Sequence, residues 1–343
     1  MARHISKSLL LLTLAVVICC GLYPLAVWAI AQAFFPFQAN GSLVQGPDGT
    51  VVGSLLIAQP FTKDEYFQPR PSAASYDASA SASSALAPSN YALRDRVART
   101  IGPVATYAGG PKAGQPVAPD VEAWFRQDQF QGQPHLVAQW ADAHNALAQA
   151  WPKADPLNTA FVDEWTKAHP DVVAQFVKDN PGTPTPAATD LAVLFFEDWS
   201  KAHPGAFPSI VDHAGADGKT AKAVEPVTEG SDIQSTFFEM WREEHPDVAL
   251  AEVPGDLVTT SGSGLDPHIT LDNARFQLAR VAAAWAKDTK RDAGDVQREI
   301  EALLRQHAFA PGGGLFGVPM VNVLEVNLEL RKKYGEPGVV SAS

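Results

Sequence analysis

Cysteine is nearly absent from this 343-residue sequence, which limits the kinds of site that the chain can build. Its two cysteines, Cys19 and Cys20, are neighbours inside an apolar stretch. Adjacent cysteines in such a place make a poor disulfide or metal site. We therefore expect no disulfide framework and no cysteine-based metal centre, and we interpret both side chains as small hydrophobic groups.

Basic residues are also in short supply. The sequence has 26 Lys and Arg residues against 38 Asp and Glu residues, and its formal net charge is -12 at pH 7. Such a balance disfavours binding to a phosphate backbone, so we expect no nucleic-acid partner. Because the acidic residues are scattered along the chain, we interpret them as a solvated surface.

Sequence motifs that carry catalysis are missing as well. The chain has no P-loop, no G-x-S-x-G nucleophile elbow, no H-E-x-x-H zinc motif and no aspartyl-phosphate signature. Gly312-x-Gly314-x-x-Gly317 matches the dinucleotide fingerprint, but the segment before it is predicted to be helical and no βαβ unit surrounds it. We interpret this match as a turn.

Charged residues are absent from Leu9 to Phe35. Such a stretch can cross the roughly 30 Å hydrocarbon layer as a helix of about 20 residues. Arg3 and Lys7 precede it and no Lys or Arg follows before Lys63, so the positive-inside bias predicts a cytoplasmic N-terminus and places the remainder outside.

Two further features of this stretch bear on its role. Ala29-Ile30-Ala31 would suit a cleaved secretory signal, but the apolar run before it is longer than the h-region of a signal peptide, so an anchor is favoured. Pro24 predicts a kink whose freed carbonyl needs a donor from a neighbour, which favours a helix that packs on other membrane helices.

The remainder begins with a predicted hairpin over 42–57, whose two strands are joined by Gly46-Pro47-Asp48-Gly49. Residues 71–90 are dominated by Ser, Ala and Pro, a composition typical of a flexible linker. Further on, Thr270 is expected to cap a helix that runs to about Asp288, and a second helix is expected to start near Asp292. The segment 321–330 fits a strand, a short helix or one leading into the other.

An irregular repeat occupies the middle of the chain. Its copies are Phe161-x3-Trp165-x3-His169-Pro170, Phe195-x3-Trp199-x3-His203-Pro204, Phe237-x3-Trp241-x3-His245-Pro246 and the degenerate Trp140-x3-His144. A spacing of four places the three side chains on one helical face, and the proline ends each helix. Four such histidines suggest a metal site, but we favour capping and packing because each lies where a helix C-terminus attracts partial positive charge.

Fold class and organisation follow from these observations. We predict an α+β protein, with one N-terminal transmembrane helix followed by a mixed α/β extracytoplasmic domain that carries a largely helical insertion. The predicted segments are a cytoplasmic N-terminus at 1–8, the transmembrane helix at 9–35, the two parts of the outer domain at 36–99 and 250–334, the insertion at 100–249 and a flexible tail at 335–343.

Nine short motifs in register along the sequence resemble one family, the C subunit of the Kdp potassium pump. The residues that carry this resemblance are Gly21-x-Tyr23-Pro24, Gln38-Ala-Asn40-Gly41-Ser42, Gly53-Ser54-x2-Ile57-x-Gln59-x-Phe61, Tyr66-Phe67-x2-Arg70-Pro71-Ser72, Pro88-Ser89-Asn90, Asp256-Leu-Val-Thr259, Ser263-Gly264-Leu265-Asp266-Pro267-His268-Ile269, Arg280-Val281-Ala282 and Pro319-x-Val-Asn322-Val-Leu-Glu325-x-Asn327-Leu328.

This resemblance implies a non-catalytic accessory subunit, without a cofactor or metal of its own, in a complex that uses ATP and transports potassium ion. The implied partners are a channel-like ion-conducting subunit, a P-type ATPase subunit and membrane lipid. The family's C subunit is anchored in the cell inner (plasma) membrane by one helix and has assembly and catalytic-chaperone roles that raise the ATP affinity of the pump. Arg70, Asn90, Asp266 and Asn322 would position loops or partners.

The sequence departs from the family in two places. The Gly-rich stretch of the family is Ser81 to Leu86 here, and the segment from about 100 to 250 is much longer than the usual connection. Two other functions stay open: an anchored extracytoplasmic scaffold or binding protein that uses the insertion, and an anchored hydrolase that uses Ser263, Asp266 and His268. We favour a tight turn for that trio, in which Ser263 and Asp266 bond to the backbone.

Overall fold

The computed structural model describes residues 2–46, 49–87, 89–130, 132–214 and 220–337, and it divides into two compact units. Unit 1 combines Met1–Ala85 with Pro254–Ser343, and unit 2 is Leu86–Val253. The expected turn residues Pro47 and Asp48, the motif residue Pro88 and tail residues 338–343 lie outside the described residues. The structure has the predicted mixture of helices and strands.

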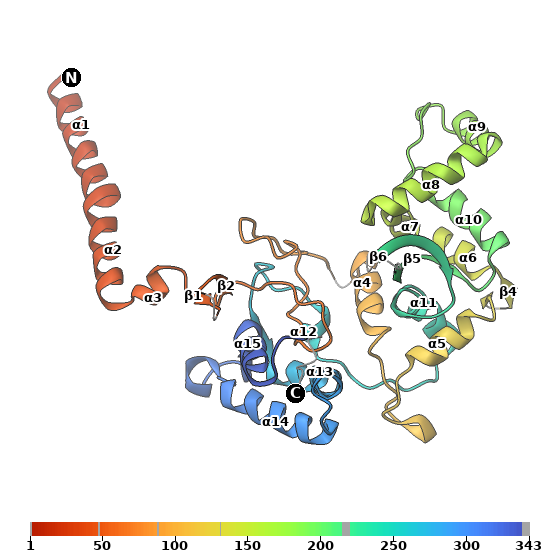
Figure 1. Ribbon diagram of the computed structural model, residues 1–343. Helices are drawn as coiled ribbons and strands as arrows, with labels where there is room; N and C mark the ends of the chain where they lie inside the picture. Colours follow the sequence, from red (N-terminus) through yellow and green to blue (C-terminus); the bar gives the residue numbers. More distant parts are fainter. Residues whose placement is uncertain (1, 47–48, 88, 131, 215–219, 338–343) are drawn as a thin grey trace. The chain divides into compact units, whose positions relative to one another are not determined.

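Unit 1 begins with a long helical run, which Figure 1 shows as one continuous coil. It consists of α1 (Ala2–Val16), a π-helical stretch (Val17–Leu22) and α2 (Tyr23–Phe34). Pro24 cannot donate to the helical ladder, and the wide turns lie directly before it, where the Tyr23 N–H bonds to the Ile18 carbonyl. Residues His4–Phe34 are long and apolar enough to cross a membrane, and the most apolar part of this helix is not buried.

A short turn joins this helix to the predicted hairpin. After α3 (Pro36–Ala39), strands β1 (Leu43–Gln45) and β2 (Val51–Ser54) pair in antiparallel fashion, with Leu43 opposite Ser54. This confirms the hairpin expected within 42–57.

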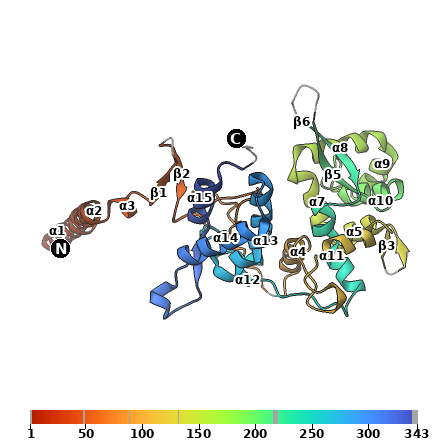
Figure 2. The ribbon, with the colours of Figure 1, turned by 60° about the horizontal axis from the view of Figure 1, so that its bottom comes forward.

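The C-terminal part of unit 1 supplies most of its core. Its elements are α12 (Gly255–Val258), β7 (His268–Thr270), α13 (Leu271–Thr289), α14 (Ala293–His307), a 3-10 turn (Pro311–Gly314), β8 (Met320–Asn322) and α15 (Val323–Tyr334). Strands β7 and β8 are antiparallel, and α13, α14 and α15 lie side by side in Figure 2. Trp285, Ile300 and Val326 are fully buried between them.

Three local predictions for this part are confirmed. The Thr270 hydroxyl accepts a hydrogen bond from the Asn273 N–H and caps α13, and the Asp292 carboxylate caps α14 in the same way through the Asp295 N–H. Segment 321–330 is a strand that leads into a helix, since β8 ends at the residue that caps α15.

Unit 2 is mainly helical. Its elements are α4 (Tyr91–Ile101), a 3-10 turn (Gly110–Lys112), α5 (Ala118–Phe125), β3 (Gln129–Phe130), β4 (Gln133–Pro134), α6 (Leu136–Ala143), α7 (Asn145–Ala154), α8 (Pro156–Ala168), α9 (Pro170–Asp179), α10 (Ala192–Ala202), β5 (Phe207–Ala214), β6 (Thr220–Val227) and α11 (Ser231–Glu244). Strands β5 and β6 form an antiparallel ribbon, visible in Figure 2.

Aromatic rings fill the core of unit 2. The Trp140 ring is edge-on to Phe196 and Phe207, with centroids 5.2 and 5.5 Å apart, and Phe237 packs against both Phe125 and Phe207. Pairs in this geometry add about 0.5–1.5 kcal/mol each beyond the area that they bury. The spacing of four predicts one helical face for each copy, and the Phe and Trp residues of these faces meet in one core.

Candidate functional site

An extended segment of unit 1, residues 55–85, contains no helix or strand and is the part of the fold on which the family motifs converge. Its backbone N–H and C=O groups need partners wherever they are buried. Side chains from residues 254–334 supply many of these partners. The segment is therefore fixed by hydrogen bonds that join the two halves of unit 1, far apart in the sequence.

Asn327 makes the most buried of these connections. This side chain on α15 is fully buried, its Nδ2 donates to the Phe67 carbonyl at 2.9 Å and its Oδ1 accepts from the Phe67 N–H at 2.9 Å. One amide thus satisfies both backbone groups of Phe67, whose ring is 1% exposed. Neither an aspartate nor a leucine of the same size can do both.

The next residue of the segment is held in the same manner from α13. Gln277 donates to the Gln68 carbonyl at 3.0 Å and accepts from the Gln68 N–H at 2.8 Å. Gln277 is a site residue that the sequence interpretation missed. It lies one turn before Arg280, but a glutamine on a buried helix face has no distinctive pattern in a single sequence.

Arg280 completes this side of the segment. Its guanidinium donates to the carbonyls of Asp64 and Tyr66, at 2.8 and 3.1 Å, and lies 3.5 Å from the Asp64 carboxylate. Burial lowers the pKa of Arg280 from its usual high value, and the Asp64 carboxylate opposes that shift. The neighbouring rings of Phe61, Tyr66 and Trp285 pack in contact.

Arg70 and Ser72 hold the following turn against residues 259–264. The Arg70 guanidinium donates to the Thr260 carbonyl at 2.9 Å, and the Ser72 hydroxyl donates to the Gly264 carbonyl at 2.5 Å. Gly264 has φ +72°, and a Cβ there would lie 2.7 Å from the Ala82 carbonyl oxygen. Only glycine fits this position without displacing the backbone.

Residues 71–85 have the composition of a flexible linker but are bonded to the loop at 260–264. The Ala82 N–H donates to the Ser263 carbonyl at 3.0 Å, and the Ser84 hydroxyl lies 3.0 Å from the Thr260 hydroxyl. Serine-rich composition was a misleading signal, because the Ser81 and Ser84 hydroxyls bond to the opposite loop.

Asp266 and His268 lie beside a shallow cavity of about 550 Å³ that Arg70 also lines. The Asp266 carboxylate accepts from the His268 N–H at 3.1 Å and lies 2.9 Å from Nδ1 of the imidazole. These hydrogen bonds to His268 lower the pKa of Asp266, the Arg70 charge 4.0 Å away acts in the same direction, and partial burial opposes it. The carboxylate is therefore held in its charged form.

Ser263 is not aligned for catalysis in this loop. Its hydroxyl accepts from the Leu265 N–H at 3.1 Å, and among the described residues it has no hydrogen bond to His268. The imidazole instead bonds to Asp266 and meets the Phe309 ring edge-on. The tight turn that the sequence favoured is confirmed, and the nucleophile–base pair that a hydrolase needs is not formed by these residues.

Asn322 connects the hairpin to α15. Its Oδ1 accepts from the Glu325 N–H at 3.2 Å as the helix cap, and its Nδ2 donates to the Leu55 carbonyl at 2.8 Å. The Glu325 carboxylate lies 3.3 Å from the imidazole of His307. One asparagine therefore starts a helix and fixes the strand end opposite it.

Asn40, Gly41 and Ser42 form the turn between the long helix and the hairpin. Asn40 Nδ2 donates to the Pro36 carbonyl at 2.7 Å, and the Gly41 carbonyl accepts from the Ser54 hydroxyl at 2.7 Å. Gly41 and Ser42 both have positive φ values, 85° and 50°. The motif thus forms the turn by which the chain leaves the helix and enters strand β1.

The remaining motif residues fall into three groups. Gly21, Tyr23 and Pro24 lie in the long apolar helix, and Asn90 caps α4 of unit 2 by accepting from the Ala92 N–H. Others support the segment directly, through burial or through a backbone hydrogen bond to it. These are Leu265, whose carbonyl accepts from the Ala58 N–H, and the buried Ile269 and Val281. Gln59 belongs to the segment itself, and its side chain occupies the space beside Gly53. For Pro71 and Ser89 the structure shows no specific contact among the described residues.

An apolar helix of membrane-spanning length precedes a small α+β unit, whose two sequence halves are joined by buried amides and half-buried guanidiniums. This arrangement is consistent with a membrane-anchored subunit. The family model of the K+-transporting ATPase c chain matches residues 5–122 and 216–332, which together are more than half of the sequence. The chain belongs to this family.

Individual relatives agree with the family match. The KdpC subunit of the potassium-transporting ATPase from Pseudomonas entomophila (strain L48) is 53% identical over 97 residues, which are 28% of this chain and 52% of that protein. The match therefore spans about half the length of this relative. The KdpC subunit of Caulobacter vibrioides (strain NA1000 / CB15N) is 29% identical over 336 residues, 97% of this chain and 95% of the relative.

Proposed function

We propose that this chain is the accessory c subunit of an ATP-driven potassium uptake pump, where it supports assembly and acts as a catalytic chaperone. The observation that carries the proposal is the agreement between family and fold. The family motifs converge on one framework, in which Asn327, Arg280 and Arg70 fix the extended segment, and this framework follows an unburied apolar helix.

The proposed topology follows from the distribution of charge around that helix. The N-terminus is cytoplasmic, the helix crosses the cell inner membrane once, and residues 36–343 lie outside. Pro24 and the wide helical turns before it are suited to a helix that packs against other membrane helices, because loosened backbone groups are tolerated where neighbours satisfy them. The helix then belongs to the assembly interface as well as to the anchor.

Co-purification tests the assembly role. The full chain, tagged at its C-terminus and produced with the rest of its pump, should retrieve a channel-like subunit and a P-type ATPase subunit, and its loss should abolish growth at limiting potassium. Retrieval of the chain alone would overturn the proposal. The chaperone role predicts that ATP hydrolysis by the pump reaches half its maximum rate at a higher ATP concentration when this subunit is absent.

A membrane-anchored scaffold is the second candidate, because unit 2 has its own core and its own boundaries. The Gly102 backbone lies against the Gln234 backbone, so a short Gly-Ser linker can replace residues 105–235 within the insertion and keep the family-motif residues Ser89 and Asn90. A pump subunit should keep its partners and support growth after this replacement. A scaffold that acts through unit 2 should lose its function entirely.

A further inference from the structure

The histidines of the repeat do not all behave alike. In three copies the imidazole lies against the tryptophan ring four residues before it. The ring centroids are 4.9 Å apart for Trp165 and His169, 4.2 Å for Trp199 and His203, and 4.7 Å for Trp241 and His245. These three histidines confirm the expectation of capping and packing. The alternative of a metal site is therefore considered for the fourth histidine, His144.

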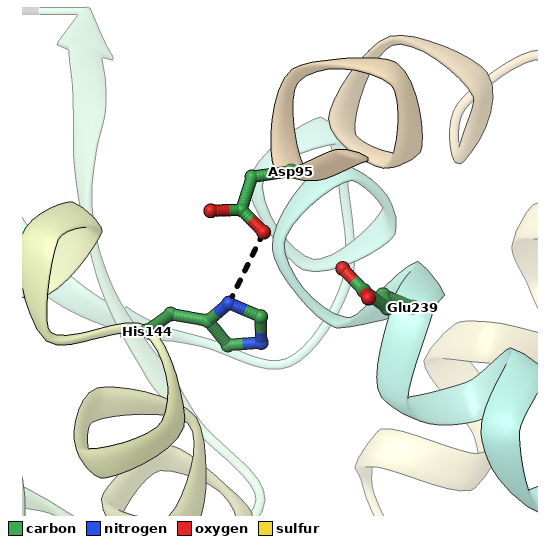
Figure 3. A group of neighbouring side chains, drawn as sticks. All are labelled: Asp95, His144 and Glu239. Atoms are coloured by element: carbon green, nitrogen blue, oxygen red, sulfur yellow. Dashed lines mark ion pairs between the residues drawn. The ribbon is translucent and has the colours of Figure 1, made fainter. Parts of the chain in front are cut away.

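His144 ends α6 but directs its imidazole elsewhere. Its backbone N–H bonds to the Trp140 carbonyl at 2.8 Å, as the N–H groups of His203 and His245 do to their own tryptophans, whereas its Nδ1 lies 3.4 Å from Oδ1 of Asp95. Among the described residues its ring does not stack on Trp140. Figure 3 shows the ring facing Asp95 on α4, with the Glu239 carboxylate on α11 beside them.

The three side chains have the spacing of a metal-binding group. One ligand atom from each lies within 4.8 Å of the other two. Metal–ligand bonds of about 2.0–2.1 Å give a tetrahedron with edges of about 3.3–3.4 Å. The distance of 3.4 Å between His144 and Asp95 already matches such an edge, and it is longer than a normal hydrogen bond.

Burial and charge favour a cation at this place. The side chains of Asp95, His144 and Glu239 are only 16%, 17% and 13% exposed. Burial raises the pKa of Glu239, while the neighbouring Arg94 opposes the shift. Arg94 contacts Glu239 and also donates to Glu243 at 2.7 Å, so it can remain on Glu243 when a cation takes Glu239.

One further arginine is electrostatically coupled to the cluster. Asp95 interacts with Arg99, whose pKa is lowered by burial, but Arg99 is shared with Asp232 and donates its own hydrogen bond to Thr236. The positive charge on Arg99 is thus only partly available to Asp95. A divalent cation can supply the positive charge that the two carboxylates of the cluster still need.

We propose that Asp95, His144 and Glu239 bind one divalent transition-metal ion, with zinc as the best match to one imidazole and two carboxylates. A water molecule would complete a four-coordinate site. The ion would fix α4, the α6–α7 junction and α11 to one another within unit 2. This site is independent of the proposed role in the pump.

Zinc uptake by the full chain tests the site. The detergent-purified protein, stripped with EDTA and re-equilibrated with Zn²⁺, should retain one more zinc per chain than His144→Ala, measured by mass spectrometry of the bound metal. Asp95→Asn, which keeps the shape of the side chain, should weaken zinc binding roughly tenfold or more in calorimetry. Zinc should raise the unfolding temperature of the wild type by more than that of either variant.

His169→Ala is the matched control, because His169 ends its helix in the same motif but stacks on Trp165. It should bind zinc like the wild type. Circular dichroism in EDTA checks that each variant is folded. If His144→Ala does not fold, Glu239→Gln takes its place in the comparison. Equal zinc uptake by the wild type and by two folded cluster variants, or no uptake by the wild type, would overturn the proposal.

Discussion

Units 1 and 2 hold their chains in place by different means. In unit 1, polar side chains such as Asn327, Gln277 and Arg280 bond directly to the backbone of an extended segment. In unit 2, helices meet through stacked and edge-on aromatic rings around Trp140 and Phe237. The first arrangement depends on donors and acceptors at fixed places, and the second on apolar volume.

This difference decides how each unit responds to substitution. A hydrogen bond from a buried amide is directional, so a change of one atom leaves buried groups unpaired. An aromatic core tolerates changes of shape better than changes of size. The comparison can be tested by substitutions that remove volume in unit 2 or polarity in unit 1.

The largest effect is expected from Trp140→Ala in unit 2. Truncation of a buried tryptophan costs about 3–5 kcal/mol, and Trp140 is 2% exposed among three other rings. Amide hydrogen exchange of the full chain should speed up across unit 2 and stay unchanged in unit 1.

Trp140→Phe separates volume from polarity at the same position. The indole N–H of Trp140 is buried without a hydrogen-bond partner among the described residues. Phenylalanine removes that donor and keeps most of the apolar contact, so its destabilisation should be clearly smaller than that of the alanine variant. Equal effects of the two substitutions would contradict a core that depends on volume.

The next largest effect is expected from Asn327→Ala in unit 1. The substitution leaves the N–H and the C=O of the buried Phe67 unpaired, which costs about 2–4 kcal/mol. Exchange of the Phe67 amide and its neighbours should accelerate in unit 1, with unit 2 unaffected.

Asn180→Ala is the control for this asparagine. Asn180 is exposed in unit 2, and within the described part of the chain its Nδ2 bonds only to the Phe176 carbonyl at its own helix end. Its loss should change stability by about 0.5 kcal/mol or less. If protection at Phe67 survives in Asn327→Ala, the segment is held by its other contacts.

The sequence allowed different parts of these units to be predicted. Thr270 and Asp292 predict the starts of α13 and α14 because a helix cap is a local sequence pattern. The spacing of Phe161, Trp165 and His169 likewise predicts one helical face. The bond between Asn327 and Phe67 joins residues 260 positions apart. No local periodicity reports such a contact.

The same limit applies to the sites. The four histidines were interpreted together because their spacing from the tryptophan is identical, yet among the described residues only His144 lies in a group with two carboxylates. Its partners lie 49 residues before it and 95 residues after it in the sequence, on helices that tertiary packing brings together. The shared local pattern therefore predicted where the helices end. It did not predict that the surroundings of His144 differ from those of the other three histidines.

A smaller effect is expected from Thr270→Val at the start of α13. Valine keeps the size of the side chain but cannot accept from the Asn273 N–H or donate to the Asp256 carboxylate. Loss of the cap should destabilise unit 1 by about 1–2 kcal/mol. Amide hydrogen exchange of α13 in unit 1 can measure this, and Thr270→Ser, which restores the hydroxyl, should recover most of the loss.

The smallest effect is expected from the acid titration of Glu299 on α14. Hydrogen bonds from Arg291, Lys333 and Tyr334 lower its pKa from 4.5 to about 2. A carboxylate whose pKa is lower in the folded state than in the unfolded state stabilises the protein at pH values above its unfolded-state pKa. This contribution is complete above about pH 4.5 and is lost as the pH falls toward about 2.

The side chain is partly solvated, so the contribution should stay below about 1 kcal/mol. Glu299→Gln should therefore lower the unfolding temperature of unit 1 slightly at pH 6 and narrow its difference from the wild type as the pH falls from 4.5. Arg291→Met removes the strongest hydrogen-bond partner of Glu299. It should reduce the pH dependence of the unfolding temperature between about pH 4.5 and 2. A constant difference between wild type and Glu299→Gln at all these pH values would show that the hydrogen bonds of Glu299 act without a shift in its pKa.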